Sequence, residues 1–147
     1  MSSADAINHV IDALIARLNT NLVQLGISKV TETDQEPKYL DPPEAYVIPF
    51  VEGKDSIGMF AGGDEHVYPI NIVSFYKCDD IQTGLRPTRT YGLNALDLFN
   101  GDNGTIQSSD GLYGAEANSS TLEVGYWRVG DYIMHYWSLQ LSMRQIV

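Results

Sequence analysis

Residues 132–144 limit the fold of this chain more than any other stretch. From residue 137 onward, large apolar side chains occupy every second position, namely Trp137, Leu139, Leu141 and Met143. Because successive side chains of a strand point to opposite faces, this alternation predicts a long antiparallel strand with one dry face and one wet face. Before residue 137 both faces carry large side chains, so we expect the strand to cross the core and then reach an edge or an interface.

The first 25 residues predict a long amphipathic helix. Ser2 and Ser3 are both suited to be the N-cap, and Gly26 is suited to be the C-terminal stop. The opposite side carries polar residues such as Asn8 and Asp12, so the helix is expected to lie on the core rather than inside it. We predict a helix from about residue 3 to residue 25, with an apolar stripe of Ile7, Val10, Ile11, Leu14, Ile15, Leu18, Leu22 and Leu25.

Two strands and a long loop are predicted in the middle of the chain. Residues 44–51 and 67–76 alternate in polarity and can pair, and Pro49 indicates a sheet edge or a bulge because it has no amide donor. A polar connection with a short strand at residues 28–31 precedes them. Residues 52–66 are rich in glycine and charge, which is typical of a binding or assembly loop. The apolar residues that we predict to serve assembly in this loop are Ile57, Met59 and Phe60.

A second, shorter helix and another loop follow. The helix is expected at about residues 90–100, with Thr88 or Thr90 as its cap and Gly101 as its stop. Residues 101–120 are rich in Gly, Asn, Ser and Asp and contain few large side chains. This composition predicts a mobile loop.

A β-hairpin is predicted at the end of the chain. Residues 121–129 form its first strand, and Gly130 and Asp131 form a two-residue turn into the final strand. With 147 residues, of which 44% are hydrophobic and 19% charged, the chain has the size and composition of a single globular domain. We expect an α+β fold of order α-β-β-α-β-β, in which an antiparallel sheet of four to five strands packs against the long N-terminal helix and the shorter second helix.

The acidic charge and the single cysteine exclude several classes of protein. The chain has 19 acidic and 9 basic residues, for a formal net charge of −10. This balance argues against a protein that grips nucleic acid through a basic face, although nucleic acid could pass it without sticking. Cys78 is the only cysteine, so one chain can form neither an internal disulfide nor a thiolate metal cluster. Without a signal-peptide layout or a membrane-length apolar run, we expect a soluble protein made inside the cell.

No motif for catalysis or for binding a metal or cofactor is recognisable in the sequence. Residues 100–104 offer oxygen ligands but lack the twelve-residue calcium loop with its closing glutamate. There is no G-x-S-x-G elbow and no glycine-rich phosphate loop, and the acids after Cys78 should raise the pKa of its thiol. We therefore predict no catalytic residue, no metal and no cofactor. The alternative, a small hydrolytic or ligand-binding enzyme, requires Asp64, His66 and Asp79 to converge in a pocket.

Aromatic and polar residues of the last hairpin indicate a subunit interface. Tyr126 and Trp127 point to opposite faces of their strand, so one layer of helices cannot bury both. We predict that Trp127 faces a second subunit or lies partly exposed. On the wet face of the final strand, Gln140 and Arg144 are expected to face a channel or a neighbour, and Arg144 to pair with a carboxylate of an adjacent subunit. The dry face should meet the N-terminal helix.

The order and size of these elements resemble a known family. They are the leading helix that ends at Gly26, the strand HVYPINIVSFY at residues 66–76, the helix RTYGLNALDLF at residues 89–99 and the closing strand YWSLQL at residues 136–141. With this arrangement the chain resembles the tail terminator (tail completion, neck) proteins of tailed bacteriophages.

The resemblance implies a structural protein of the virion without enzymatic activity. Such proteins form hexameric rings that cap the finished tail tube and join it to the head connector. The implied partners are further copies of the chain, the tail tube protein and the connector or adaptor protein, with genomic DNA passing through the channel without specific binding and no membrane involved. Two structural alternatives are a head-closure or adaptor ring and a tail-tube subunit, and a tube subunit differs in polymerising into stacks.

Overall fold

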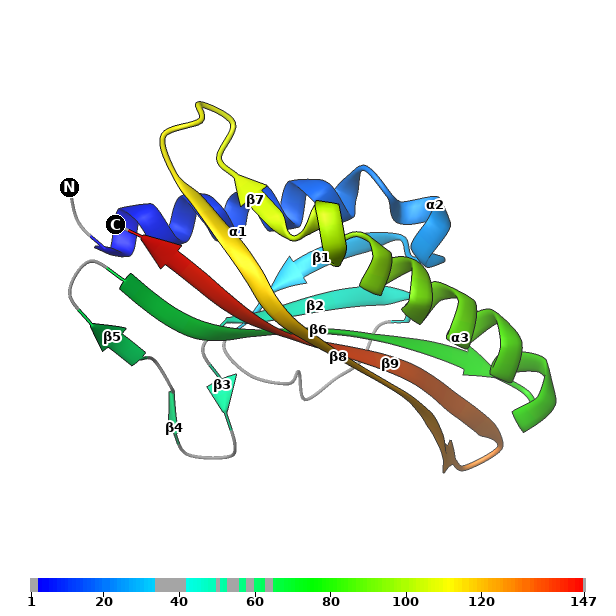
Figure 1. The fold of residues 1–147 in the computed structure, drawn as a ribbon. Helices are drawn as coiled ribbons and strands as arrows, with labels where there is room; N and C mark the ends of the chain where they lie inside the picture. The colour runs from blue at the N-terminus through cyan, green and yellow to red at the C-terminus, as the bar shows by residue number, and fades with distance from the viewer. Residues whose placement is uncertain are drawn as a thin grey trace.

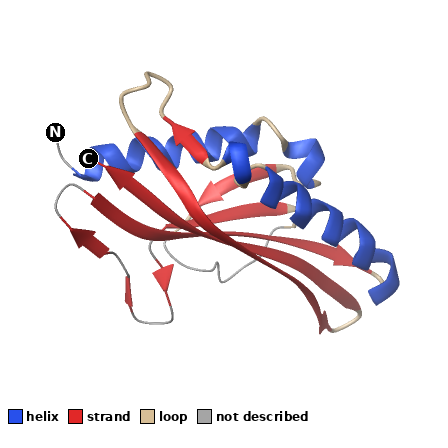
Figure 2. Cartoon of the chain, in the orientation of Figure 1, coloured by secondary structure: helices blue, strands red, loops and turns tan. Residues whose placement is uncertain are grey.

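A curled β-sheet forms the centre of the structure, and helices lie along one side of it (Figures 1 and 2). The computed structural model describes residues 3–33, 42–49, 51–52, 56–57, 60–62 and 65–146. The helices of the described residues are α1 (Ser3–Asn19), α2 (Leu22–Leu25) and α3 (Ile81–Asp97), together with the short 3-10 helix η1 (Gly101–Asn103).

The sheet contains seven strands within the described residues. Their order is β1-β2-β6-β9-β8-β7, with β5 paired to β6, while β3 and β4 form a separate two-stranded sheet. β1 pairs with β2 in parallel, and the remaining pairs are antiparallel. The strands are β1 (Lys29–Glu32), β2 (Glu44–Pro49), β3 (Val51–Glu52), β4 (Ser56–Ile57), β5 (Phe60–Gly62), β6 (Glu65–Cys78), β7 (Thr105–Gln107), β8 (Gly114–Val129) and β9 (Tyr132–Ile146).

The predicted antiparallel sheet of four to five strands over two helices is wrong. The sheet is mixed, because β1 lies parallel to β2 with Lys29 opposite Glu44. In the described part of the chain it has seven strands, accompanied by three α-helices. The strands β5 and β7 have only three residues each, too few to show an alternation of polarity. β8 begins at Gly114, so sheet pairing orders much of the stretch predicted to be a mobile loop. Polar composition misled this prediction, because edge strands tolerate polar side chains on an exposed face.

The N-terminal helix is divided in two. α1 ends at Asn19, where the side chains of Thr20 and Asn21 both donate to the carbonyl of Arg17 at 2.9 and 2.8 Å. Such local side-chain bonds compete with the helix and explain its end. The predicted stop at Gly26 is confirmed, because Gly26 ends α2 with a φ of 62°. A Cβ atom at this position would lie 2.5 Å from the ring of Tyr91, so only glycine fits here.

α3 begins about ten residues earlier than predicted. The side chain of Asp80 caps it by accepting from the amide of Thr83 at 2.7 Å, and neither Thr88 nor Thr90 is a cap. Pro87 lies inside the helix and removes one intrahelical hydrogen bond, so the helix continues past a residue that usually marks a helix start. The buried side of α3 is lined with small residues, so the helix approaches the sheet closely; these residues are Gly84, Thr88, Gly92 and Ala95.

A methyl group at Gly84 is expected to destabilise the protein. Alanine is a better helix former than glycine by about 1 kcal/mol, but its Cβ would lie 2.1 Å from Cδ2 of the buried His135 ring. Overpacking of this kind costs about 1–3 kcal/mol. We expect Gly84→Ala to lower the free energy of unfolding by about 1–2 kcal/mol in urea titrations. The exposed Thr90→Ala should show no such loss, and a more stable Gly84→Ala variant would contradict the close contact.

The core has a larger part on the helical side of the sheet. The predicted dry face of the last strand is confirmed, because Trp137, Leu139, Leu141 and Met143 are all at most 1% exposed and share one cluster with the apolar stripe of α1. Trp137 Nε1 donates to the hydroxyl of Tyr76 at 2.7 Å, and this hydroxyl donates to the Leu25 carbonyl at 2.6 Å. Burial raises the pKa of Tyr76 to about 12. The sheet is therefore tied to α2 through a buried hydrogen-bonded chain.

A second apolar cluster lies on the opposite face of the sheet, which we call the helix-free face. Its buried members come from β2, β6 and β9 and are Tyr46, Ile48, Val73, Phe75 and Met134. Partly buried side chains of the last hairpin pack against them. The predicted hairpin turn is confirmed, since Val129 pairs with Tyr132 and Gly130 has a φ of 57°. Both faces of the hairpin thus carry apolar side chains near its turn.

Candidate assembly surface

The outer edge of β8 is open over most of its length. β7 covers only Gly114–Glu116, and the amide of Ala117 donates to the Gly104 carbonyl at 2.8 Å. Within the part of the chain that the structure describes, no strand pairs with the outer edge of residues 121–129. Figure 1 shows this segment running along the margin of the sheet. An exposed row of backbone donors and acceptors of this kind can pair with another chain.

Exposed apolar side chains lie beside this edge on the helical side of the sheet. Val124 and Tyr126 of β8 are 40% and 47% exposed, and Leu85 and Leu93 of α3 are 39% and 47% exposed. On α3, Leu85, Arg89 and Leu93 recur at every fourth residue and so form one stripe. We define the α3–β8 surface as Leu85, Arg89, Leu93, Val124, Tyr126 and Arg128.

The packing of α3 turns this stripe toward β8. On one flank of the helix, Tyr91 lies against Gly26, and the side-chain amide of Asn94 donates to the Gln24 carbonyl at 2.7 Å. At 100° per residue, Leu85 and Arg89 lie on the other flank. Gly92 lies between the flanks, and a Cβ built there would be 3.3 Å from Leu122 of β8. The stripe and the open edge therefore form one continuous surface.

Trp127 lies at the same edge but on the helix-free face. Its side chain is 38% exposed. The centroid of its ring lies 5.7 Å from that of Phe75, in an edge-on arrangement, and 5.7 Å from that of Tyr136, in a tilted one. The hydroxyl of Tyr136 donates to Glu123 Oε1 at 2.7 Å, and this hydrogen bond raises the pKa of Tyr136. Trp127 thus covers the second cluster with one side of its ring, while the other part of the side chain is available for contact.

The three predicted interface residues do not form one surface. Gln140 and Arg144 are exposed on the helix-free face, as expected from the alternation. Trp127 pairs with Met134, which lies ten residues from Arg144 along β9 and hence about 33 Å away at the rise of a strand. A single contact patch therefore cannot include both Trp127 and Arg144 of one chain.

Arg144 has a partner within its own chain, which corrects the expected pairing with an adjacent subunit. Its Nε and Nη2 atoms lie 2.9 and 3.0 Å from the two carboxylate oxygens of Glu65, and the hydrogen bond to Glu65 raises the pKa of Arg144. This arrangement arises because β6 and β9 are antiparallel, so that the beginning of one strand lies beside the end of the other. Such a two-point pair fixes the end of the sheet.

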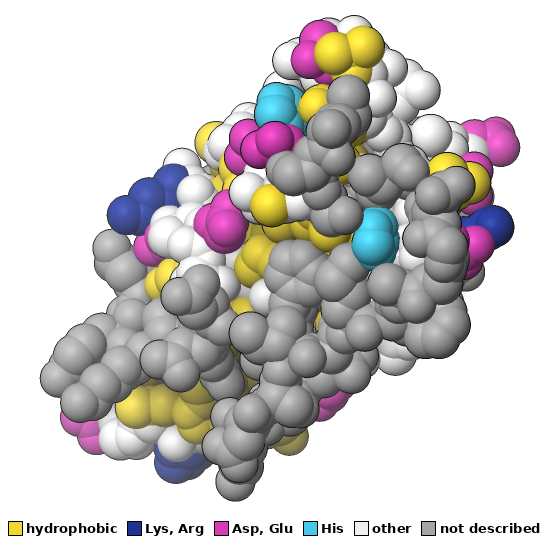
Figure 3. All heavy atoms as spheres, turned by 90° about the vertical axis from the view of Figure 1, so that its left-hand side faces the viewer, with side chains coloured by type: hydrophobic (Ala, Val, Ile, Leu, Met, Phe, Trp, Pro, Cys, Tyr) yellow, Lys and Arg dark blue, Asp and Glu magenta, His cyan; other side chains and the backbone are white. Residues whose placement is uncertain are grey.

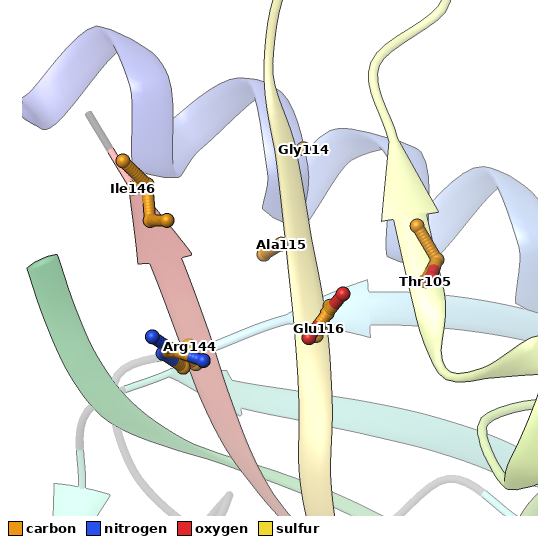
Figure 4. Close-up of a pocket in the computed structure, with 6 residues that line it drawn as sticks. All are labelled: Thr105, Gly114, Ala115, Glu116, Arg144 and Ile146. Carbon is orange, nitrogen blue, oxygen red and sulfur yellow. The ribbon is translucent and has the colours of Figure 1, made fainter.

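A shallow pocket of about 230 Å³ lies beside Arg144 at the junction of β7, β8 and β9. Figure 4 shows its lining side chains on these adjacent strands. Glu116 lies directly opposite Arg144 in the strand register, so the guanidinium is flanked by two carboxylates and is largely neutralised. The guanidinium of Arg144 is therefore not free to select an anionic ligand in this pocket. It is lined by Thr105, Gly114, Ala115, Glu116, Arg144 and Ile146.

The predicted assembly loop lies partly outside the described residues. Met59 is not described, and for Ile57 and Phe60 the structure describes the backbone alone. Ile57 belongs to β4 and pairs with Val51, whereas Phe60 belongs to β5 and pairs with Val67. The predicted role of these three side chains in assembly remains a prediction.

The residues required for an enzyme do not converge. His66 and Asp79 lie at opposite ends of β6, about 40 Å apart at the rise of a strand, and Asp64 lies outside the described residues. Among the described side chains, no group of three or more His, Cys, Asp or Glu could hold a metal ion. Burial, together with the charges of Asp80 and Asp79, raises the pKa of Cys78, as predicted from the sequence. The thiol therefore does not have the properties of an activated nucleophile.

The comparisons with known proteins assign no family to this chain, so the α3–β8 surface is the main structural evidence on function. None of the helices in the described part of the chain is both long and apolar enough to span a lipid bilayer. No protein-family model matches the sequence, and no curated protein matches it.

Proposed function

We propose that this chain is a structural subunit of a bacteriophage tail or neck, where copies of it form a ring that caps the tail tube and joins it to the head connector. The observation that carries the proposal is the open edge of β8 with its exposed apolar flanks. An open edge of this length is bordered by Val124, Tyr126 and Leu93. In a monomer it would promote aggregation, whereas in a subunit that assembles it can form the contact with the next copy.

The charge of the chain supports the same role. With a net charge of −10, a ring of several copies would surround its channel with negative potential. Such a potential repels the phosphates of DNA and lets a genome pass without binding. In this proposal the tail tube protein and the connector or adaptor are the protein partners, and the mature location is the virion.

We expect the purified protein to form closed rings, with a hexamer as the ring size implied by the resemblance to tail terminators. Size-exclusion chromatography with light scattering measures the mass, and electron microscopy shows the shape. Single rings of uniform size support a terminator or an adaptor, since their subunits do not continue to add. Filaments would indicate a tail-tube subunit, and a monomer at high concentration would contradict self-assembly through β8.

A further inference from the structure

The charges of the α3–β8 surface differ in sign from those of the whole chain. Arg89 and Arg128, and also the neighbouring Arg86, are exposed on it. The nearest acid of the edge, Glu123, points to the helix-free face, where it accepts the hydrogen bond from Tyr136. Two acids lie at its limits, because Asp97 continues the α3 stripe and Asp131 follows β8 in the turn. The three arginines still outnumber them, so this apolar surface has a positive balance on a protein with a net charge of −10.

A second surface has the complementary chemistry. On α1, Asp5, His9 and Asp12 share one exposed face of the helix. The loop between β7 and β8 covers part of this face, because the ring of His9 packs on Tyr113 with centroids 4.7 Å apart. This loop adds Asp110 and the apolar Leu112, which is 69% exposed. We define the α1 surface as Asp5, Asp12, Asp110 and Leu112.

The α1 surface is preformed rather than dependent on a partner. Oδ1 of Asp110 accepts from the Ser108 hydroxyl at 2.6 Å and from the Leu112 amide at 3.0 Å, so the loop is held by its own side chains. The hydrogen bond from Ser108 lowers the pKa of Asp110, which keeps the carboxylate charged. Figure 3, which views this end of the molecule, shows acidic side chains beside a histidine and a hydrophobic side chain in its upper part.

The two surfaces lie at opposite ends of the molecule. In Figure 1, α1 begins at the left-hand end, whereas the first turn of α3 and the turn between β8 and β9 lie at the right-hand end. The surfaces cannot meet within one chain, but each can meet the other surface of a second copy. Contacts between two different surfaces generate a ring when the rotation closes.

We propose that copies of this chain associate head to tail, with the basic and apolar α3–β8 surface of one copy on the acidic α1 surface of the next. This inference rests on the proposed function and specifies its interface. Two-fold pairing of β8 with its own image would instead bring two copies of the same arginine-bearing surface together, and like charges on facing surfaces oppose such pairing. In the head-to-tail arrangement the apolar side chains supply affinity, and the charges select the orientation.

Paired charge reversals test the arrangement. Arg89→Glu with Arg128→Glu makes the α3–β8 surface acidic, and Asp5→Lys with Asp12→Lys makes the α1 surface basic. We expect each double variant alone to be a monomer in light scattering at a concentration where the wild type assembles. A 1:1 mixture of the two variants should assemble again, with the variants alternating, because every interface in the mixed ring joins opposite charges. Assembly of the wild type should also weaken as salt is added.

The controls separate failure of this interface from failure of the proposed function. Asp79→Lys with Asp131→Lys makes the same change in net charge away from the α1 surface, and this variant should still assemble. If the wild type assembles but the Asp5 and Asp12 variant assembles equally well, or if mixing restores nothing, the head-to-tail interface is wrong while a ring remains. If the wild type is a monomer, the proposed function itself fails. Circular dichroism confirms folding, and the milder Arg89→Gln and Asp12→Asn give the same direction of effect should a reversal unfold the chain.

Discussion

Trp137→Ala is expected to remove a large part of the stability of the protein. Truncation of a fully buried tryptophan costs about 3–5 kcal/mol because it leaves a cavity as well as losing apolar burial. Trp137 is 0% exposed and also donates to the hydroxyl of Tyr76, which links the sheet to α2. Since a domain of this kind has a total stability of about 5–15 kcal/mol, the loss should be visible as a large shift of the urea midpoint.

One further variant and a fixed protein concentration make the effect of Trp137→Ala specific. Trp137→Phe keeps most of the ring volume but loses the indole donor, and it should cost roughly 1–2 kcal/mol. All unfolding curves are taken at one protein concentration, because self-association adds to the apparent stability. A loss below about 1 kcal/mol for Trp137→Ala would mean that the surrounding core collapses into the space, contrary to a tightly packed cluster.

Val124→Glu with Tyr126→Glu is expected to abolish assembly without unfolding the subunit. Both side chains are nearly half exposed in the single chain, so the fold tolerates charge there. At an interface, the lost apolar burial amounts to about 3 kcal/mol, which corresponds to about a 100-fold weaker association. The two added carboxylates would also have to lose water, which weakens association further.

A matched variant controls for the added negative charge. Val23 and Ile146 are 88% and 70% exposed and lie outside the α3–β8 surface. Val23→Glu with Ile146→Glu makes the same change in net charge and should leave the oligomer intact by light scattering. If both double variants dissociate alike, general repulsion rather than the α3–β8 surface controls assembly.

Local sequence patterns predicted those parts of the fold that depend on neighbouring residues. The alternation around Trp137 predicts which face of the strand is buried. Gly26 and Gly130 indicate positions at which the backbone adopts a positive φ. The start of α3 was missed although its signals are present, in the cap formed by Asp80 and Thr83 and in the small residues at helical spacing behind it. Pro87 opposes these signals, because proline is normally found in the first turn of a helix rather than inside it.

The features that depend on distant pairing could not be read in the same way. β1 has four residues and gains its place only by pairing with β2, and Arg144 meets Glu65 only because β6 and β9 have nearly equal lengths. Both facts follow from register rather than from composition. The α3 part of the α3–β8 surface could have been predicted from the sequence, because Leu85, Arg89 and Leu93 have the spacing of a helical stripe. That prediction requires the correct start of α3.

The position of β9 has a consequence for how the sheet is completed. β9 is the last strand in the chain and yet lies between β6 and β8, pairing with both over almost its whole length. In the described residues no other strand joins the β1-β2-β6 half of the sheet to the β8-β7 half. The two halves therefore become one sheet only when the final strand is inserted. Folding and unfolding of the subunit are thereby coupled to the non-local pairing of β9 with β6, which favours all-or-none behaviour over the stepwise growth of a sheet from one edge.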